Sequence, residues 1–278
     1  MEQTRTVDLE AAIGFVVAHG DTVDRARLAF LRTGTPPDQE VLDLVEAGQM
    51  VGAGWPARQE DRVASVDATC FRLAELDDLG ALGRPAARQA LAWLATVQRP
   101  DGTWEEHPSL AAEAPPWALP GDPEARLYLT ANAAFWLSVA ESPQRPGERI
   151  VGRLGGTYAE AVAAAASVIA GSLREDGTWP SFLIAGWLGA AVLYGQEMFY
   201  ESALMQAVLT DRLPDLSGSD AASLAAVLRR VGVDPDHRLL VAARRRLAET
   251  QRSDGGWSSD DGPAFDVHTT LTAIRACR

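Results

Sequence analysis

Residues 98–104 read QRPDGTW, residues 173–179 read LREDGTW and residues 251–257 read QRSDGGW. The three heptapeptides share an Asp-Gly pair and a Trp two positions after the first Gly, and two of them begin with Gln. Residues 49–55, QMVGAGW, form a weaker fourth copy that keeps the Gln-to-Trp spacing and lacks the Asp. Self-similarity along a chain is the signature of a repeat architecture.

The sequence between these copies has the period of a helix. Alanine is abundant, β-branched runs are scarce, and apolar residues recur at intervals of three and four. Pro, Gly and Asp or Ser residues mark the helix ends. This punctuation predicts twelve helices, near residues 8–19, 21–33, 37–48, 64–78, 85–98, 123–141, 157–173, 182–194, 197–210, 219–231, 235–251 and 264–277.

Each heptapeptide lies where one predicted helix ends and the chain must turn. An Asp-Gly pair supplies the left-handed backbone that a helix stop requires, and the Trp can pack between neighbouring hairpins. Twelve helices punctuated in this way predict an all-α fold, a single (α/α)6 barrel of six helical hairpins that spans residues 1–278 as one domain. The alternative is an open helical array with the same Trp residues in its core. We expect the loops 104–122 and 141–157 to lie on the rim of the barrel.

Composition excludes several classes of function. All 25 basic residues are Arg, so Schiff-base chemistry, a pyridoxal-phosphate lysine and a P-loop lysine are excluded. A net charge of -13 has the wrong sign for nucleic acid or an anionic membrane surface. The two cysteines cannot form a disulfide framework or a four-thiolate zinc site, and they favour a reduced, cytoplasmic compartment.

The sequence predicts no transmembrane segment. Its longest uncharged apolar run, residues 182–194, is shorter than the roughly 17–25 residues that a spanning helix requires. Peripheral contact with a membrane is the one membrane association that the composition leaves open.

The repeated motifs resemble those of the class II terpene cyclases, the squalene-hopene and oxidosqualene cyclase family, whose signature is a repeated Gln and Trp motif. The family's acid motif, Asp-x-Asp-Asp-Thr-Ala, precedes one such repeat, and residues 65–70, SVDATC, precede QRPDGTW here. Residues 186–195, GWLGAAVLYG, resemble the segment that follows another repeat. The resemblance covers nearly all of residues 40–278, and the length is similar to that of single-domain members.

This resemblance implies a terpene cyclase β-domain-like barrel that protonates an alkene or epoxide of a polyprenyl or prenylated aromatic substrate, without metal or cofactor. It places the proton donor at Asp67, with Ser65 and Ala68 where the family has further Asp residues. Burial among apolar groups can keep such a carboxyl protonated. Spacing alone allows another role, in which a charged Asp67 caps the helix that begins near residue 66.

A second position of the acid site follows from residues 129–133, LTANA, which match the segment where the family places a His against the acid. Asn132 stands at the position of that His. We expect Asn132 to contribute to catalysis through a hydrogen bond that fixes which oxygen of Asp67 carries the proton.

Aromatic faces stabilise a carbocation in a dry pocket. We expect the substrate-facing rings to come from inner helices and rim loops, with core packing as the alternative role of each ring. Phe182, Trp187 and Tyr194 rank first because they lie in or next to the stretch that resembles the family. The expected set is Trp117, Tyr128, Phe135, Phe182, Trp187, Tyr194 and Phe265.

The last predicted helix opens with residues 266–270, DVHTT. Neutral imidazole suits removal of the final proton near pH 7, so we expect His268 to be the terminating base, with a structural histidine as the alternative. The stretch also resembles the zinc-binding segment of protein prenyltransferase β subunits. Asp67 and Cys70 do not have the spacing of the Asp-x-Cys pair that completes such a zinc site, so a prenyltransferase is disfavoured.

The rim and the overall function leave two further expectations. His107 could line the entrance, whereas Glu105 and Glu106 beside it are expected to be solvated rim charges. The principal alternative to a cyclase is a non-catalytic barrel that binds an isoprenoid or a protein, because the SVDATC motif lacks two of the family's acidic residues.

Overall fold

The computed structural model describes residues 5–140 and 156–278, so the expected rim loop 141–157 lies almost wholly outside the described residues. Within those two ranges the chain forms twelve α-helices, and the bounds of each lie within three residues of the predicted ones. The inner helices are α2 (Thr22–Thr33), α4 (Val66–Asp78), α6 (Pro123–Val139), α8 (Leu183–Gly195), α10 (Gly218–Arg230) and α12 (Asp266–Ala276). The outer helices are α1 (Leu9–His19), α3 (Gln39–Glu46), α5 (Pro85–Thr96), α7 (Ala159–Ser172), α9 (Phe199–Arg212) and α11 (Arg238–Thr250).

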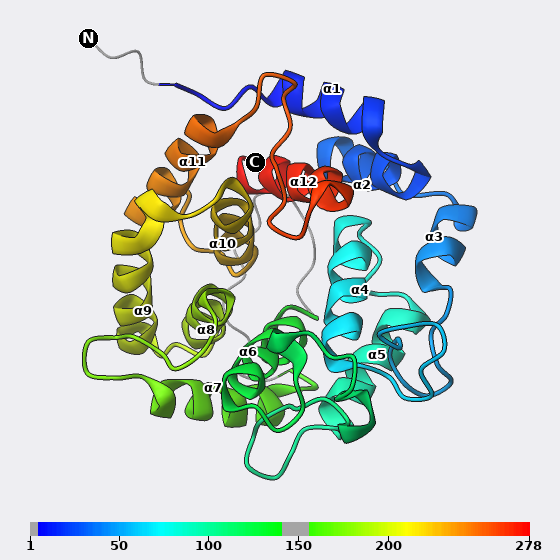
Figure 1. Cartoon of the computed structure of the whole chain (residues 1–278), viewed down its shortest axis with the longest axis vertical. Coiled ribbons are helices and arrows are strands. Elements are labelled where there is room, and N and C mark those ends of the chain that lie inside the picture. The colour runs from blue at the N-terminus through cyan, green and yellow to red at the C-terminus, as the bar shows by residue number, and fades with distance from the viewer. Residues whose placement is uncertain (1–4, 141–155) are drawn as a thin grey trace.

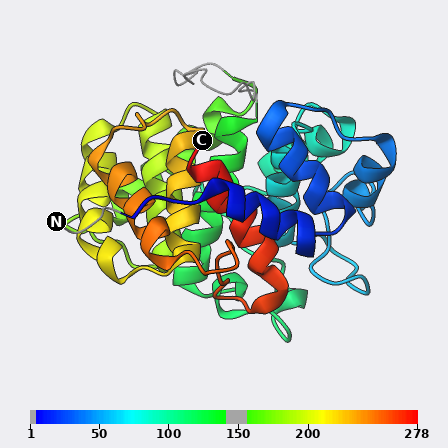
Figure 2. The ribbon, with the colours of Figure 1, turned by 90° about the horizontal axis from the view of Figure 1, so that it is seen from above.

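The inner helices follow one another around a ring, and the outer helices surround them (Figure 1). Each inner helix contacts the next, and α12 contacts α2, which closes the ring. Helix α1 lies against α12, so the first and last parts of the chain are neighbours (Figure 2). These contacts agree with an (α/α)6 arrangement and not with an open array.

The repeated Gln residues join successive outer helices. Gln98 Nε2 donates to the carbonyl of Gly102 in its own turn at 3.0 Å and to that of Ala161 on α7 at 2.9 Å. Gln251 bonds in the same way to Gly255 and to Asp8, which caps α1. Each Gln therefore ties the end of one outer helix to the start of the next.

The weaker copy at residues 49–55 makes the same contacts. Gln49 Nε2 donates to Ala53 in its own turn and, at 2.8 Å, to Ala86 on α5. The copy at residues 173–179 has the Asp-Gly pair but begins with Leu173, so it has no side-chain amide to make this link. The Gln-to-Trp spacing therefore predicts the link better than the Asp-Gly pair does.

The repeated Trp residues fasten the outer layer to the inner one. Trp104 and Trp257 are fully buried, and their Nε1 atoms donate to Leu94 and Leu247 at 2.8 and 3.0 Å. The backbone N–H of three of the repeated Trp residues also donates to a threonine hydroxyl on the following inner helix. The pairs are Trp104 with Thr130, Trp257 with Thr270 and Trp55 with Thr69.

Trp179 uses a different contact, because its ring lies against Gly186 on α8. A Cβ at Gly186 would stand 2.0 Å from Trp179 Cζ2, so only glycine fits beneath this ring.

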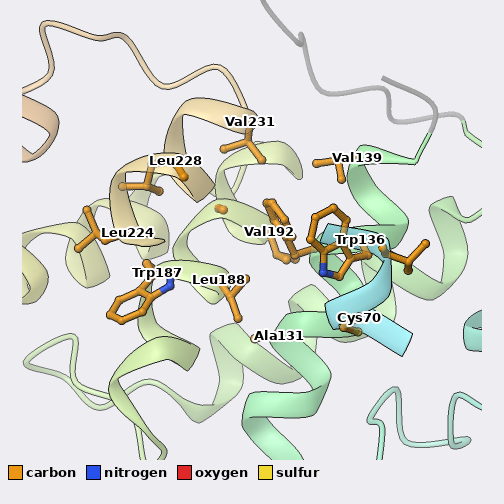
Figure 3. Close-up of a cluster of buried hydrophobic side chains, with 14 of the residues drawn as sticks. Cys70, Ala131, Trp136, Val139, Trp187, Leu188, Val192, Leu224, Leu228 and Val231 are labelled. Carbon is orange, nitrogen blue, oxygen red and sulfur yellow. The ribbon is translucent and has the colours of Figure 1, made fainter. Parts of the chain in front are cut away.

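The core is continuous from the inner ring to the faces of the outer helices. Figure 3 shows part of it, in which Trp136 from α6 and Trp187 from α8 lie with Leu188, Val192 and Leu228. Four short 3-10 turns complete the described elements: η1 (Pro108–Leu110), η2 (Pro116–Ala118), η3 (Leu213–Asp215) and η4 (Pro263–Phe265). No helix of the described ranges is long and apolar enough to cross a membrane.

Candidate active site

Helix α4 begins with its N–H groups already satisfied by residues other than Asp67. Ser65 is the N-cap, and its Oγ accepts from Ala68 N at 3.0 Å. The carboxylate of Glu106 accepts from Val66 N at 3.0 Å, from Asp67 N at 2.9 Å and from Ser65 Oγ at 2.7 Å. The Asp67 carboxyl is therefore not used as a cap and can face the interior of the barrel.

The prediction for Glu106 was wrong. Its side chain is buried, because it points toward the start of α4 and accepts a hydrogen bond there from Val66 N. Burial raises the pKa of Glu106, and the hydrogen bonds from Asp67 N, Ser65 and Val66 oppose that rise. Glu105 is only partly buried and pairs with Arg99, as a rim residue can.

Both oxygens of Asp67 accept hydrogen bonds. Tyr128 Oη lies 2.7 Å from Oδ1, and Trp117 Nε1 lies 3.0 Å from Oδ2. Asn132 Nδ2 donates to Tyr128 Oη at 3.1 Å. Because the Asn132 amide nitrogen can only donate, the Tyr128 oxygen accepts from it and the Tyr128 hydroxyl directs its own proton to Asp67.

The hydrogen bond expected between Asn132 and Asp67 is thus indirect. Asn132 lies one helical turn beyond Tyr128 on α6 and acts on Asp67 through the tyrosine hydroxyl. Tyr128, expected to be only an aromatic contact, is a direct partner of the acid. Trp117, which lies on η2 in the predicted rim loop, is the other.

The pKa of Asp67 is raised. Burial is the largest cause, and the nearby carboxylate of Asp261 adds to it. The hydrogen bonds from Tyr128 and Trp117 lower the pKa and offset part of the rise. Desolvation in this setting favours the protonated form of the carboxyl, while two donors stand ready for the charge that appears when the proton leaves.

A cavity of about 790 Å³ lies inside the inner ring and includes Asp67 in its wall. Helices α4, α6 and α8 supply most of its aromatic and aliphatic lining, and α10 and α12 supply most of its hydroxyl groups. Near the acid, Asp220, Asp260 and Asp261 also face this space. Burial and the other two carboxylates raise the pKa of Asp220 to about 6.

Six of the seven aromatic residues expected to face the substrate line the cavity. Tyr194 does not; it lies near the end of α8 and packs edge-on against Phe199, with ring centroids 5.4 Å apart. Two further rings, Phe71 and Trp136, also line the cavity. The six residues are Trp117, Tyr128, Phe135, Phe182, Trp187 and Phe265.

His268 lines the cavity, but its contacts do not suit a base. Its Nδ1 lies 3.1 Å from Nη2 of Arg27, and a guanidinium can only donate, so Nδ1 accepts and the ring proton lies on Nε2. Burial and the charge of Arg27 lower the pKa of His268 to about 4, against the opposing effect of Asp78. These contacts favour a neutral N–H donor at His268 over the expected terminating base.

An ion-pair cluster joins α2, α4, α10 and α12 at the C-terminal end of α4. Asp78 accepts from Arg27 at 2.8 Å and from Arg275 at 2.6 Å. Asp77 is bound by Arg230 at 3.1 Å and by Arg275. Burial alone would raise the pKa of Asp77, but the two guanidinium groups outweigh it and lower the pKa to about 2.

The resemblance to a zinc-binding segment finds no support in these contacts. Asp266 accepts from Arg252 and from Ser259 N, away from His268, which is bound to Arg27. Within the described ranges no three His, Cys, Asp or Glu side chains are grouped to hold a metal ion. His107, expected at the entrance, is exposed and caps η1 through Ser109 N, outside the cavity lining.

Similar folds occur among solved structures. A protein from Actinoplanes matches with a TM-score of 0.61 at 17% identity, over 96% of this chain and 97% of that one. The type II terpene cyclase MstE from Scytonema, in its apo form, matches with a TM-score of 0.60 at 16% identity, over 96% and 95% of the two chains. An MstE variant in complex with its substrate, geranylgeranyl dihydroxybenzoate, gives 0.58 at 16% identity over 96% and 94%.

At these identities the similarity establishes a shared fold. No protein-family profile matches the sequence, and no curated protein matches it significantly. The assignment of chemistry therefore depends on the residues of the cavity.

Proposed function

We propose that this protein is a class II terpene or meroterpenoid cyclase, in which Asp67 protonates an alkene or epoxide of a polyprenyl substrate. One observation carries the proposal: a carboxyl with a raised pKa lies in the wall of a large aromatic cavity and is not needed to cap its own helix. The similarity of the fold to a type II terpene cyclase agrees with this assignment. In this proposal the barrel of residues 1–278 acts as one domain.

The first step transfers the carboxyl proton of Asp67 to one carbon of a double bond. A C–H bond forms, the π bond is consumed, and the neighbouring carbon becomes a carbocation. The carboxylate left behind is stabilised by the Tyr128 hydroxyl and the Trp117 indole, which already donate to its two oxygens. Asn132 orients Tyr128 for this role.

The cation then moves along the chain as further double bonds attack it and rings close. In this proposal the rings of Phe71, Phe135, Trp136 and Trp187, which line the cavity, stabilise the cation, each by about 0.5–2 kcal/mol depending on desolvation. Loss of a proton from the last cation ends the reaction as an isomerisation.

The acidic groups at the Asp67 end favour an uncharged part of the substrate there. Asp220, Asp260 and Asp261 face the same space, and a diphosphate beside them would be repelled. The double bond to be protonated is uncharged, so it is the part of a prenyl chain that fits this end.

The test is turnover of farnesyl, geranylgeranyl and prenylated hydroxybenzoate substrates in D2O. The wild type is expected to give cyclic isomers that carry one deuterium from the exchanged Asp67 carboxyl, and Asp67→Asn is expected to give none. Asp211→Asn, a change of the same kind at an exposed position on α9, should retain activity. Equal turnover by Asp67→Asn would refute the mechanism, and binding without turnover by the wild type would favour a non-catalytic isoprenoid-binding barrel.

A further inference from the structure

The neutral ring of His268 has an N–H donor that the protein does not use. Its Nε2 carries the proton, because Nδ1 accepts from Arg27. Among residues 5–140 and 156–278, Nε2 has no hydrogen-bond partner; it is not fully buried, and His268 lines the cavity. Because buried N–H groups are nearly always hydrogen-bonded, this N–H is expected to bond to an acceptor on a ligand in the cavity.

The tautomer is fixed from behind by a rigid partner. Arg27 is buried, and Asp78 and Asp24 hold its guanidinium at 2.8 and 3.3 Å. A guanidinium has no acceptor atom, so Nδ1 of His268 cannot donate a hydrogen bond to Arg27 and does not carry the ring proton. The N–H on Nε2 is therefore set before any ligand enters.

The orientation of the ring is fixed as well. His268 stacks on Phe71, with ring centroids 5.3 Å apart and an angle of 23° between the rings. Phe71 is part of the cavity wall and follows Asp67 by four residues on α4, which is about 6 Å along the helix axis. The donor thus lies about one helical turn from the acid in the direction of Asp78, which also lines the cavity, so a chain whose double bond lies at Asp67 can pass it.

Two neighbouring threonine hydroxyls on α12 already have partners. The Thr272 hydroxyl donates to the carbonyl of His268 at 3.0 Å, and the Thr269 hydroxyl lies 3.4 Å from that of Ser219. The indole N–H of Trp187 has no partner in the described part of the chain either, but it is fully buried. His268 is therefore a donor that a ligand can reach without breaking a hydrogen bond between the described residues.

We propose that His268 selects an oxygenated prenyl substrate by donating its Nε2–H to an acceptor oxygen, such as a hydroxyl, carbonyl or carboxylate oxygen of the head group. This inference rests on the proposed function for the identity of the ligand as a prenyl compound. It makes His268 a specificity residue that distinguishes an oxygenated chain from the corresponding hydrocarbon.

The test compares the binding of farnesol and of its deoxy hydrocarbon, followed by tryptophan fluorescence, in the Asp67→Asn background so that no turnover intervenes. Farnesol is expected to bind more tightly. His268→Phe, which keeps an aromatic ring against Phe71, should weaken farnesol binding roughly three- to ten-fold, the loss of one neutral hydrogen bond, and leave the hydrocarbon unchanged. His268→Gln, which retains an N–H donor and an acceptor, should recover part of the loss.

Two results would overturn the inference. One is equal binding of the two ligands by the His268-containing protein, and the other is equal weakening of both by His268→Phe. Nitrogen-15 spectra of the histidines, recorded with and without farnesol, give a reading that needs no variant: the Nε2 resonance of His268 should shift with farnesol and not with the hydrocarbon. Because every measurement is of binding, absence of turnover in the wild type would remove the proposed cyclase activity and leave the role of His268 to be judged separately.

Discussion

Tyr128 on α6 donates a hydrogen bond of 2.7 Å to Oδ1 of Asp67 on the neighbouring inner helix. The direction of this bond is fixed by Asn132, which occupies the tyrosine oxygen as a donor. A carboxyl whose two oxygens both accept hydrogen bonds is better prepared to lose its proton than burial alone would allow. The strength of the acid is therefore set by α6 and η2 as well as by α4.

Tyr128→Phe is expected to reduce kcat roughly 10- to 100-fold, because a hydrogen bond to a charged group contributes about 1.5–3 kcal/mol. The bond from Tyr128 lowers the pKa of Asp67, so its removal raises that pKa. The high-pH limb of the rate profile, where Asp67 loses its proton, should move to higher pH. Rate profiles of the variant and of Tyr200→Phe, an exposed control, test this; an unshifted limb would contradict it.

Glu106→Ala is expected to destabilise the fold by at least about 1–3 kcal/mol. One buried donor left without an acceptor costs about 1–3 kcal/mol, and this variant leaves more than one. The donors are Val66 N and Asp67 N at the start of α4. Glu106→Gln keeps one acceptor oxygen and should lose less. Urea unfolding of these variants, with the exposed Glu113→Ala as control, gives the comparison; a loss no greater than that of the control would show that the cap is dispensable.

Asp77→Asn is expected to cost about 3–5 kcal/mol, because it leaves the guanidinium groups of Arg230 and Arg275 without their buried partner. The folded-state pKa of Asp77 is depressed from 3.8 to about 2. Its contribution of about 2 kcal/mol is therefore present above pH 4 and is lost as the pH falls to 2. Unfolding free energies measured over this range should fall less steeply in the variant; parallel curves would exclude the assignment.

Gly186→Ala is expected to destabilise the protein by about 1–3 kcal/mol through overpacking against Trp179. Gly171 on α7 provides a matched control, since a Cβ there meets nothing within 4 Å. Gly171→Ala should be neutral or stabilising by up to about 1 kcal/mol. Thermal unfolding of the two variants distinguishes a specific contact from a general effect of alanine, and equal melting temperatures would refute the contact.

The sequence predicted the helices and their ring because the signals are local and repeated. Helix stops, caps and the Gln-to-Trp spacing each act within a few residues, and Gln49 shows that this spacing persists where the Asp-Gly pair is lost. Asp67 could be found because its motif lies just before a repeat. Family resemblance then distinguished it from a helix cap, and the structure assigns the cap to Ser65.

The rest of the site could not be predicted, because it depends on how far each helix extends past the cavity and on contacts between residues distant in sequence. Tyr194 is seven residues after Trp187 and on the same side of α8, but the helix extends beyond the cavity there. Periodicity gives the face of a helix and not the depth. The tautomer of His268 is set by Arg27, 241 residues away, and no local pattern encodes that contact.

The pairing of Gln251 with Asp8 has a consequence for biosynthesis. On a ribosome α1 emerges long before the residues that hold its first turn, and α12 follows later still. Helix α12 forms the wall of the Asp67 cavity between α10 and α2, so the cavity stays open on that side until α12 has packed. A nascent chain is therefore expected to expose the apolar surfaces of α10, α2 and α1 that α12 covers in the finished fold.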